Sequence, residues 1–321
     1  MKSSHHVIVA IPTYNRAGSL DRTIRSVLDQ DLGTVTALVS DDASSDETEG
    51  LCRTHAERDP RVIYHRQPLN LGVTANYNWL VSAALDRDPE RTAFFMFLSD
   101  DDWLDRDYCR RCVQRLESSA DLSLVAGRTA LHAESGEVGH DPDINLFAQS
   151  GAQRVWDFCQ GVVPTGVFAG IMRTGTVSKL PPQRNVLGHD WLFLTNVAYL
   201  GKFATEPATR VHRGVDGVSS ARFGLAATLG VARLQAVKPL ATIGFFLVLE
   251  CLHRSPVFAR LSLLQRVNLA GSIVAGLAVR RIVPLLERQP SRQLERAALN
   301  VVSRSRGAVR RFDATRRPAD Y

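Results

Sequence analysis

The sequence is poor in cysteine, and its cysteines lack the spacing that a structural metal site requires. There are five of them, an odd number, and only one pair has C-x-x-C spacing: Cys52, Cys109, Cys112, Cys159 and Cys251. A zinc site of that kind needs a second pair of ligands, which the sequence does not contain. We therefore expect Cys109 and Cys112 to be ordinary residues of a helix over 105–118, in a protein from a reducing compartment.

Long apolar segments are also absent. The run Val7–Ile11 is too short for the core of a secretory signal and is typical of a buried strand. Pro239–Leu249 and Leu269–Val279 each provide roughly half of the ~20 apolar residues that span a bilayer, and Arg280 and Arg281 interrupt the second. We predict packing or interfacial helices and a cytoplasmic protein, either free or peripheral at the inner face of the plasma membrane.

Acidic residues are scarce in the last third of the chain. Residues 222–321 contain 17 Arg and Lys against 5 Asp and Glu, a balance of +12, whereas the preceding residues have a balance of −6. Such a region suits an anionic partner, and the interleaved aromatic residues that would favour a nucleic acid are missing. We predict a basic helical region over 222–321 that contacts a membrane or forms a homo-oligomer, with a partly disordered tail from Ser291.

The rest of the chain alternates strand-like and helix-like patterns. Strand patterns are followed by helical spacing at Leu20–Leu28, Val73–Ala84 and residues 105–118. This alternation is typical of a parallel sheet with helices on both faces. We predict an α/β domain over 1–221, with strands at Val7–Ile11, Val35–Val39, Val62–Tyr64, Phe94–Leu98 and Leu122–Ala126.

Several local features complete this prediction. Ser44 and Glu47 have the S-x-x-E spacing of a capping box at the start of a helix. Residues Gly127–Gln160 lose periodicity, so we expect a long loop with short elements there. Val162–Arg173 has a strand-like pattern, and Trp191–Tyr199 has a helical one.

Polar clusters stand where three of the predicted strands end. Thr13–Arg16 follows the first strand, Asp41 and Asp42 follow the second, and Asp100–Asp102 follows the fourth. In parallel α/β sheets, ligands bind at the carboxyl ends of the strands. These loops are therefore expected to converge on one crevice.

The turn of three aspartates is a candidate cation site. Neighbouring carboxylates repel one another, and Mg²⁺ or Mn²⁺ with oxygen ligands offsets that repulsion while sharing its shell with substrate phosphates. A solvated turn with a helix cap at Asp105 is the alternative. Asp41 and Asp42 can accept hydrogen bonds from a pyrimidine N–H or a ribose hydroxyl, or they can cap the following helix.

Four segments of the chain, taken in order, resemble the motifs of glycosyltransferase family 2. They are Val9–Arg16, similar to the opening motif; Asp41–Thr48, similar to D-D-x-S-x-D-x-T; Asn70–Asn78, similar to N-x-G-x-x-x-x-x-N; and Phe97–Leu104, similar to the metal-binding D-x-D region. Together they cover roughly Val7–Leu104, and weaker matches extend the resemblance to about Ser220.

This resemblance implies a GT-A (Rossmann-like) fold and metal-assisted, inverting transfer from a nucleoside-diphosphate sugar. It implies nucleotide-sugar contacts from Pro12, Thr13, Tyr14, Arg16, Asp41, Asp42, Asn70, Gly72, Asn76, Asp100 and Asp101. Many members have an aspartate where Ser99 stands, so the acidic residues here are shifted. The family pattern favours Asp102 as the main ligand of Mn²⁺ or Mg²⁺, with Asp100 beside it. Asp101 is expected on the ribose or in the water shell of the metal.

Two weaker matches concern the reaction itself. Gly188–Trp191 resembles the segment that supplies the general base, so Asp190 is the candidate base for the acceptor hydroxyl, and a helix N-cap is the alternative. Arg210–Ser219 resembles the R-x-H-x-x-S-x-S loop, whose histidine, here His212, can approach the metal or the diphosphate; a surface-loop histidine is the alternative. By position, three residues are expected near the acceptor: His189, Trp191 and Arg173.

We therefore predict an inverting glycosyltransferase acting on the hydroxyl of a glycan, a small molecule or a lipid-linked acceptor. A nucleotidyltransferase is disfavoured because Pro12–Asn15 stands where a Gly-rich loop with Lys or Arg would follow the first strand. A catalytically inactive binding protein on the same fold is the alternative, and the presence of Asp100–Asp102 together with Asp190 argues against it. The sequence does not choose among UDP, dTDP and GDP donors.

Overall fold

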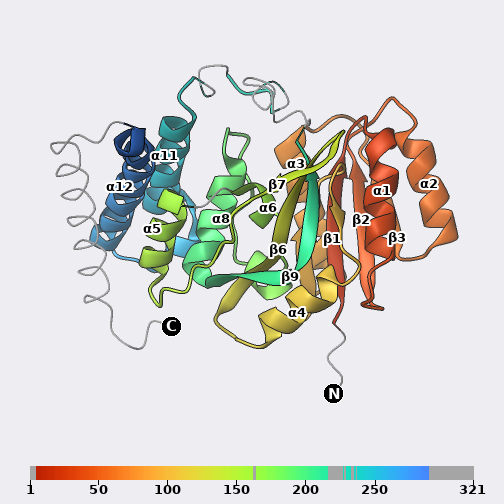
Figure 1. Ribbon diagram of the computed structural model, residues 1–321, viewed down its shortest axis with the longest axis horizontal. Coiled ribbons are helices and arrows are strands. Elements are labelled where there is room, and N and C mark those ends of the chain that lie inside the picture. The colour runs from red at the N-terminus through yellow and green to blue at the C-terminus, as the bar shows by residue number, and fades with distance from the viewer. Residues whose placement is uncertain are drawn as a thin grey trace.

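The computed structural model describes residues 5–161, 164–215, 227, 229–232, 235 and 237–288. The molecule is elongated, with the N-terminal sheet at one end of its long axis and the C-terminal helices at the other (Figure 1). The expected disorder of the tail from Ser291 lies outside the described residues.

The N-terminal half is built on a five-stranded sheet with the order β3-β2-β1-β4-β8. Neighbouring strands are parallel except for the β4–β8 pair, which is antiparallel. Its strands are β1 (Val7–Thr13), β2 (Val35–Asp41), β3 (Val62–Arg66), β4 (Phe94–Phe97) and β8 (Met172–Arg173). The predicted mostly parallel α/β sheet is therefore confirmed.

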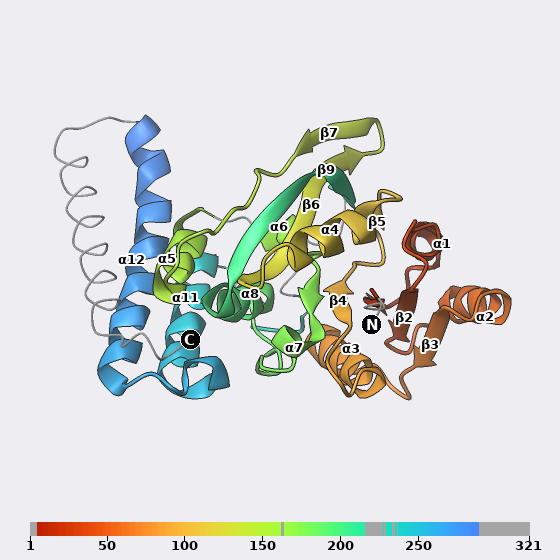
Figure 2. The same cartoon turned by 90° about the horizontal axis from the view of Figure 1, so that it is seen from below.

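Helices cover both faces of this sheet, as predicted. Helices α1 (Ala17–Leu28) and α4 (Tyr108–Glu117) lie on one face and α3 (Val73–Arg87) on the other (Figure 2). Because successive side chains of a strand point to opposite faces, β1 contributes to two separate apolar clusters. Val7, Val9 and Ile11 pack with α1 and α4, whereas Ile8 and Ala10 pack with α3.

A second, four-stranded sheet with the order β5-β9-β6-β7 lies beside the first. Its strands are β5 (Trp103–Leu104), β9 (Lys202–Gly214), β6 (Leu122–Ala133) and β7 (Gly136–His140). An isolated bridge between Val125 and Ile171 connects β6 to the segment just before β8. Through β5, which begins one residue after Asp102, this sheet holds the far side of the aspartate turn.

The middle of the chain is more regular than the sequence predicts. The expected loop over Gly127–Gln160 is wrong, because β6 and β7 form a hairpin there and α5 (Gly151–Gly161) follows. The expected strand over Val162–Arg173 is reduced to β8, preceded by α6 (Pro164–Val167). Pairing with distant strands, which local periodicity does not reveal, decides both segments.

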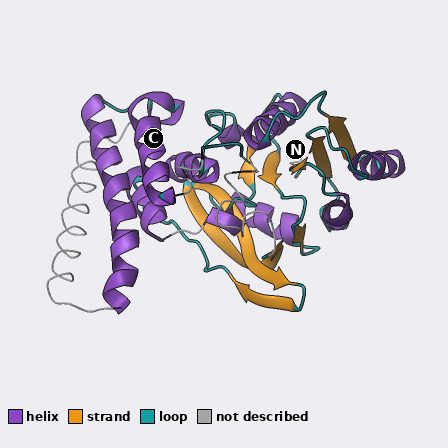
Figure 3. Ribbon diagram, turned by 90° about the horizontal axis from the view of Figure 1, so that it is seen from above, coloured by secondary structure: helices purple, strands orange, loops and turns teal. Residues whose placement is uncertain are grey.

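The C-terminal helices belong to the same hydrophobic core as the first sheet. Helices α11 (Pro239–Leu249) and α12 (Leu263–Arg288) pack on α5 and on α8 (His189–Leu200) (Figure 3). Leu247 and Ile273 join the cluster that contains Ile8. The shorter elements are α2 (Thr48–Arg58), α7 (Thr174–Val177), a π-helical turn (Glu250–Arg254) and a 3₁₀ turn (Pro256–Phe258).

Arg280 and Arg281 do not end the second apolar helix, since α12 continues to Arg288. No helix within the described part of the chain combines the length and apolar character needed to cross a bilayer. The packing role expected for Pro239–Leu249 and Leu269–Val279 is confirmed by their buried faces, which include Ile243, Leu247 and Ile273. All five cysteines are buried and unpaired, and Cys109 and Cys112 lie in α4, within the helix predicted over 105–118.

Candidate active site

The predicted convergence of polar loops occurs at the carboxyl edge of the first sheet. Strands β1, β2 and β4 are parallel, so Thr13, Asp41 and Phe97 end them on the same side. Thr13 lies beside Asp41 in register, and the Asp42 N–H donates to the Thr13 carbonyl at 2.9 Å. The aspartate turn follows β4 directly and completes this edge.

The loops after β1 and β2 are locked to each other. Asn15 and Ala43 both have left-handed backbone conformations, with φ of 53° and 62°, which is uncommon for residues other than glycine. The Asn15 N–H donates to Ser44 Oγ, and Asn15 Oδ1 accepts from the Ser45 N–H, each at 2.8 Å. Strained backbone held by such cross-links is typical of binding sites. It leaves Tyr14, 47% exposed, at the open edge.

The expected capping box at the start of α2 is wrong. Helix α2 begins at Thr48, and Asp46 Oδ1, rather than Ser44, accepts from its Thr48 N–H at 3.0 Å. Asp46 Oδ2 also accepts from the Ala17 N–H, the first residue of α1. Ser44 is instead used to hold Asn15.

Asp41 does not face the site, which corrects the expectation that it binds the nucleotide. Its side chain is fully buried, with Oδ1 accepting from the Ser44 N–H and Oδ2 from the Tyr64 hydroxyl, both at 2.8 Å. Asp42 is nearly buried and accepts from the N–H groups of Leu71 and Gly72 at 2.6 and 3.0 Å. Asp42 thus holds the loop before α3 rather than standing free.

The Asn70–Asn78 segment also divides into structural and exposed residues. The Asn76 side chain is buried and makes two hydrogen bonds with Ser40: Asn76 Oδ1 accepts from the Ser40 hydroxyl, and Asn76 Nδ2 donates to the Ser40 carbonyl oxygen. The expected contact of Asn76 with the nucleotide sugar is therefore wrong. Gly72, with φ of 83°, adopts the conformation that favours glycine at the start of α3. Asn70 is exposed and accepts from the Gly72 N–H.

The aspartate turn places two carboxylates in a poorly solvated environment. Burial raises the pKa of Asp102 to about 7, although Arg213 opposes the shift. Burial raises the pKa of Asp100 to about 7 as well, and the Thr13 hydroxyl and Arg16 oppose it. Thr13 Oγ1 is itself buried without a partner at hydrogen-bond geometry. Asp102 is 3% exposed, and its Oδ2 accepts from Arg213 Nε at 3.1 Å.

Tyr77 on α3 is within electrostatic reach of three of the predicted acidic site residues. Burial raises the pKa of its phenol, and the charges of Asp100, Asp190 and Asp102 raise it further, while Arg213 lowers it. The Tyr77 ring also packs against Phe97 and Phe168. The sequence showed Tyr77 only as a helix-face residue and gave Arg213 no role, since neither carries a recognisable spacing signal.

Asp190 lies in the first turn of α8, next to this group. Its carboxylate makes no hydrogen bond or ion pair to any residue that the structure describes. The preceding Gly188 has φ of 86°, and a Cβ there would lie 2.4 Å from Ile243 Cγ1 of α11. The C-terminal helices therefore press directly on the segment that presents Asp190.

Of the three residues expected near the acceptor, His189 is the one whose side chain packs against Tyr77. Its Nδ1 is 2.7 Å from Gln183 Oε1, and burial lowers the pKa of the ring. Trp191 points into the core, against Phe158 and under the Arg280 guanidinium, so its expected role is wrong.

Arg173 lies at the opposite end of the sheet, because β8 pairs it with Phe94 at the amino end of β4. Its guanidinium donates to the carbonyl oxygens of Leu116 and Leu122. The expected acceptor role of Arg173 is therefore wrong, and the residue instead holds the end of α4.

His212 is committed to a network behind the aspartate turn. Its Nε2 lies 2.9 Å from Asp105 Oδ1, its Nδ1 lies 3.0 Å from His132 Nε2, and its ring stacks on Trp103. The structure thus shows no contact between His212 and Asp102, and the neighbouring Arg213 makes that contact. The loop over 216–219 lies outside the described residues.

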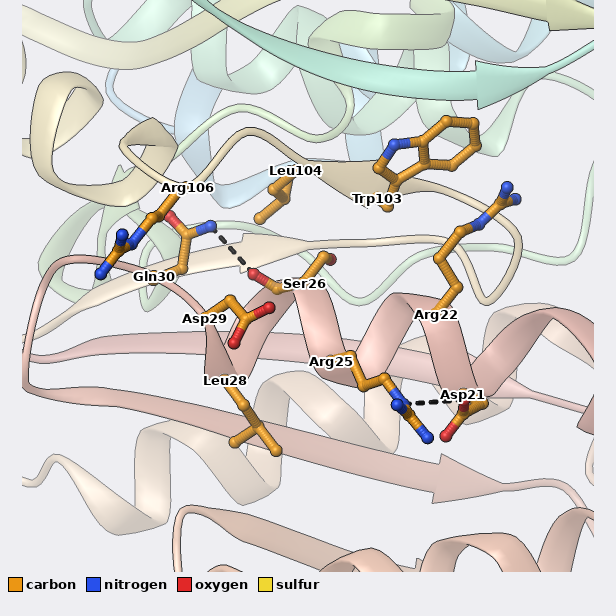
Figure 4. Close-up of a pocket in the computed structure, with 10 residues that line it drawn as sticks. All are labelled: Asp21, Arg22, Arg25, Ser26, Leu28, Asp29, Gln30, Trp103, Leu104 and Arg106. Atoms are coloured by element: carbon orange, nitrogen blue, oxygen red, sulfur yellow. Dashed lines mark hydrogen bonds and ion pairs between the residues drawn. The ribbon is translucent and has the colours of Figure 1, made fainter. Parts of the chain in front are cut away.

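A groove of about 800 Å³ lies on the α1 side of the turn, and none of the predicted site residues lines it (Figure 4). Arg22 stacks on Trp103, 3.6 Å from the ring centroid, and donates to the Asp101 carbonyl at 3.3 Å. The Thr23 hydroxyl donates to the Asp102 carbonyl at 2.7 Å. Helix α1 therefore braces the backbone of the turn from outside the site.

The residues present suit a divalent cation with oxygen ligands. Asp100 and Asp102 are close, poorly solvated carboxylates, which is the donor set that Mg²⁺ and Mn²⁺ prefer. Within the described ranges, no three His, Cys, Asp or Glu side chains form a group that could hold a metal alone. A cation here would need further oxygen ligands from water or substrate, as is usual for Mg²⁺.

The raised pKa values predict a loss of stability as pH rises. Between about pH 4 and pH 7 the folded protein binds more protons at Asp100 and Asp102 than the unfolded chain does. The free energy of unfolding that these two groups contribute is therefore fully present below about pH 4 and is lost by about pH 7. We expect the double variant Asp100→Asn/Asp102→Asn to lose less unfolding free energy than the wild type between pH 5.5 and 8.0. Urea unfolding in EDTA measures this, and equal pH slopes would contradict it.

The comparisons with known proteins point to one family. A family model described as "Glycosyl transferase family 2" matches residues 8–176, just over half of the chain. The "Glycosyltransferase GlyA" of Streptococcus pneumoniae is 25% identical over 119 residues, covering 37% of this chain and 16% of that protein. The "GalNAc(5)-diNAcBac-PP-undecaprenol beta-1,3-glucosyltransferase" of Campylobacter jejuni is 34% identical over 96 residues, 30% of this chain and 29% of that protein. The chain thus matches less than a third of the length of either relative.

Solved structures match over nearly the whole chain. The crystal structure of S. aureus TarS 1-349 in complex with UDP-GlcNAc aligns with a TM-score of 0.58 and 15% identity, covering 96% of this chain and 83% of that one. A longer TarS structure aligns with a TM-score of 0.56 and covers 96% of this chain and 50% of that one. At this identity the similarity establishes the fold.

Proposed function

The chain belongs to glycosyl transferase family 2 and has the GT-A fold, and from this premise we propose that it transfers a sugar from a nucleoside diphosphate to an acceptor hydroxyl with inversion. One observation carries the proposal. Asp100, Asp102 and Asp190 all lie close enough to Tyr77 for their charges to raise the pKa of its phenol, so the two carboxylates proposed to hold a cation and the proposed base lie near one side chain.

Asp190 is the proposed general base. Its carboxylate is unpaired within the described chain, so it is available to accept a proton from the acceptor hydroxyl. The acceptor oxygen would then bond to the anomeric carbon as the bond from that carbon to the diphosphate oxygen breaks. Displacement by one base on one face inverts the anomeric centre. His189, held by Gln183, lies beside Asp190 and is proposed to orient the acceptor.

Asp102 and Asp100 are the residues proposed to hold a divalent cation. Such a cation, when bound, neutralises charge on the departing diphosphate. The loops around Pro12–Arg16 and Asn70–Gly72 are proposed to hold the nucleotide through Tyr14 and backbone groups, since Asp41 and Asp42 are engaged within the protein. UDP is the first nucleotide to test, because the TarS structure contains UDP-GlcNAc.

The test is release of nucleoside diphosphate from a panel of UDP-, dTDP- and GDP-sugars with Mn²⁺, with and without candidate acceptors. Thermal unfolding with each nucleotide first identifies which nucleotide binds, and so which donors to test. A ligand at 100 times its Kd raises the free energy of unfolding by about 2.7 kcal/mol. Turnover of one donor supports the proposal. Tight nucleotide binding with no turnover of any donor would favour an inactive binding protein.

A lipid-linked acceptor at a membrane surface is the proposed acceptor class. Leu263 and Leu264 on α12 are 68% and 69% exposed, and Phe245, Val267 and Val274 are also exposed. The region from 222 onward carries the basic excess that anionic lipids attract. The relative from Campylobacter jejuni has an undecaprenol-linked substrate in its name.

This membrane contact predicts flotation with anionic liposomes. The double variant Leu263→Asp/Leu264→Asp is expected to lose most of that binding, because two exposed leucines each contribute roughly 1.5–3 kcal/mol when buried. Val138→Asp on β7, also an exposed apolar residue, is the matched control. Point variants are needed because α11 and α12 share the core with the sheet. Unchanged flotation of the double variant would contradict the proposed membrane contact.

A further inference from the structure

Arg213 makes an ion pair with a proposed metal ligand inside the site. Its Nε donates to Asp102 Oδ2 at 3.1 Å, and the two side chains are 19% and 4% exposed. A charge-assisted hydrogen bond in such poorly solvated surroundings is stronger than the same contact at the surface. The ion pair with Arg213 therefore opposes the binding of a metal cation to Asp102.

The strand that carries Arg213 is fixed in place. His212, one residue earlier, pairs with Trp103 across β5 and β9 and is held by Asp105 and His132. The backbone at Arg213 is also in register with Leu131 of β6. Only the long Arg213 side chain, rather than its strand, is free to change partners.

The rest of the Arg213 guanidinium is available for an anion. Its Nη1 and Nη2 groups make no hydrogen bond to any residue in the described ranges, and Asp102 Oδ1 has none either. Two free donors in a fixed fork match the geometry of a phosphate group. Arg213 also lies close enough to Tyr77 for its charge to lower the pKa of the phenol, as Asp102 and Asp190 lie close enough to raise it.

We propose that Arg213 is an exchangeable counter-ion of Asp102: a divalent cation that binds the carboxylate, first through the free Oδ1, competes with the ion pair, and the released guanidinium then binds the diphosphate of the donor. This inference rests on the proposed function. It makes metal and nucleotide binding mutually reinforcing, because each ligand favours the arrangement in which Arg213 has left Asp102. By linkage, each ligand strengthens the other by the same factor.

The variant Arg213→Ala separates the two halves of the exchange, because they change in opposite directions. Mn²⁺ alone is expected to bind about tenfold more tightly than in the wild type, equivalent to about 1.4 kcal/mol, because its competitor is gone. UDP in saturating Mn²⁺ is expected to bind about tenfold more weakly, because a diphosphate contact is lost. Isothermal titration at pH 8.0 measures both affinities on the full chain.

Three controls keep the result interpretable. Arg210→Ala removes an exposed arginine of the same strand, paired with Glu137, and is expected to change neither affinity. Arg213→Lys retains the charge and is expected to restore most of the competition with Mn²⁺. Arg213→Gln retains much of the length if the alanine variant fails to fold, which circular dichroism and thermal unfolding will show.

The proposal requires the affinity for Mn²⁺ to rise and the affinity for UDP to fall in Arg213→Ala. Unchanged or weaker Mn²⁺ binding by Arg213→Ala overturns the exchange, as does unchanged UDP affinity. If the wild type turns over a donor while either result is obtained, only the inference fails and the proposed function stands. If neither protein binds Mn²⁺, with or without UDP, the inference fails together with the proposed metal site, and donor turnover in EDTA then decides the glycosyl transfer separately.

Discussion

Replacing Asp190 with asparagine is expected to lower the rate of glycosyl transfer by roughly 10²- to 10⁴-fold, the range typical of a lost general base. Asparagine has nearly the same shape but does not accept the acceptor proton. Because the Asp190 carboxylate has no partner in the described chain, its loss breaks no internal bond and should leave the fold intact. Initial rates at saturating donor and acceptor, with thermal unfolding of each variant, measure the effect.

The prediction for Asp190 distinguishes chemistry from binding. Nucleotide affinity in Mn²⁺ is expected to stay within about threefold of the wild type, since an interaction made only in the transition state lowers kcat without changing ground-state binding. Asp86→Asn is the matched control, since Asp86 is an exposed aspartate of α3, the helix that carries Tyr77. An Asp190→Asn variant that transfers sugar at the wild-type rate would remove Asp190 from the mechanism.

Replacing Asp102 with asparagine is expected to remove the effect of metal on nucleotide binding. The affinity for UDP in Mn²⁺ should fall at least about 100-fold, to the value that the wild type shows in EDTA, because residues that merely support metal ligands already cost about 10–100-fold. Asp102 is the nearly buried carboxylate of the turn, and its Oδ1 is unoccupied by any described residue. Titration calorimetry with and without EDTA gives both numbers.

Asp101→Asn provides the comparison within the same turn. Asp101 is only partly buried, and the structure attaches the turn to Arg22 through the Asp101 carbonyl rather than its carboxylate. The loss of UDP affinity should therefore be less than about tenfold, as for a group in the water shell of a metal or on a ribose. A larger loss for Asp101→Asn than for Asp102→Asn would reverse the proposed assignment of the turn.

The parts of the fold that the sequence predicts correctly are those with strong local patterns. Continuous apolar runs such as Val7–Ile11 and Phe94–Leu98 form central strands, because both faces of a parallel strand are buried. The hairpin of β6 and β7 was not predicted because Gly136 and Glu137 are exposed and β7 has no alternating apolar pattern. Edge strands of this kind are defined by their pairing partners instead.

The residues of the candidate site likewise divide into those with a local sequence signal, which were predicted, and those without one, which were not. Asp100 and Asp102 were predicted from their place after an apolar strand, and Asp190 from the resemblance of Gly188–Trp191 to a family segment. Arg213 was not, since it lies 111 residues from the aspartate that it contacts. Trp191 was misplaced because a helix that is apolar all round gives no indication of which face is outside.

The sequence by itself determined which polar residues follow which strands, and therefore the edge of the sheet at which they meet. That follows from chain connectivity and from the rule that parallel strands end on one side. Only the tertiary structure decided which of those residues face the site. Asp41 and Asn76 turn inward because Tyr64 and Ser40 lie within hydrogen-bond distance, and buried polar groups need such partners. Asp102 faces Arg213 for the same reason, because β9 packs beside the turn only after the chain has folded.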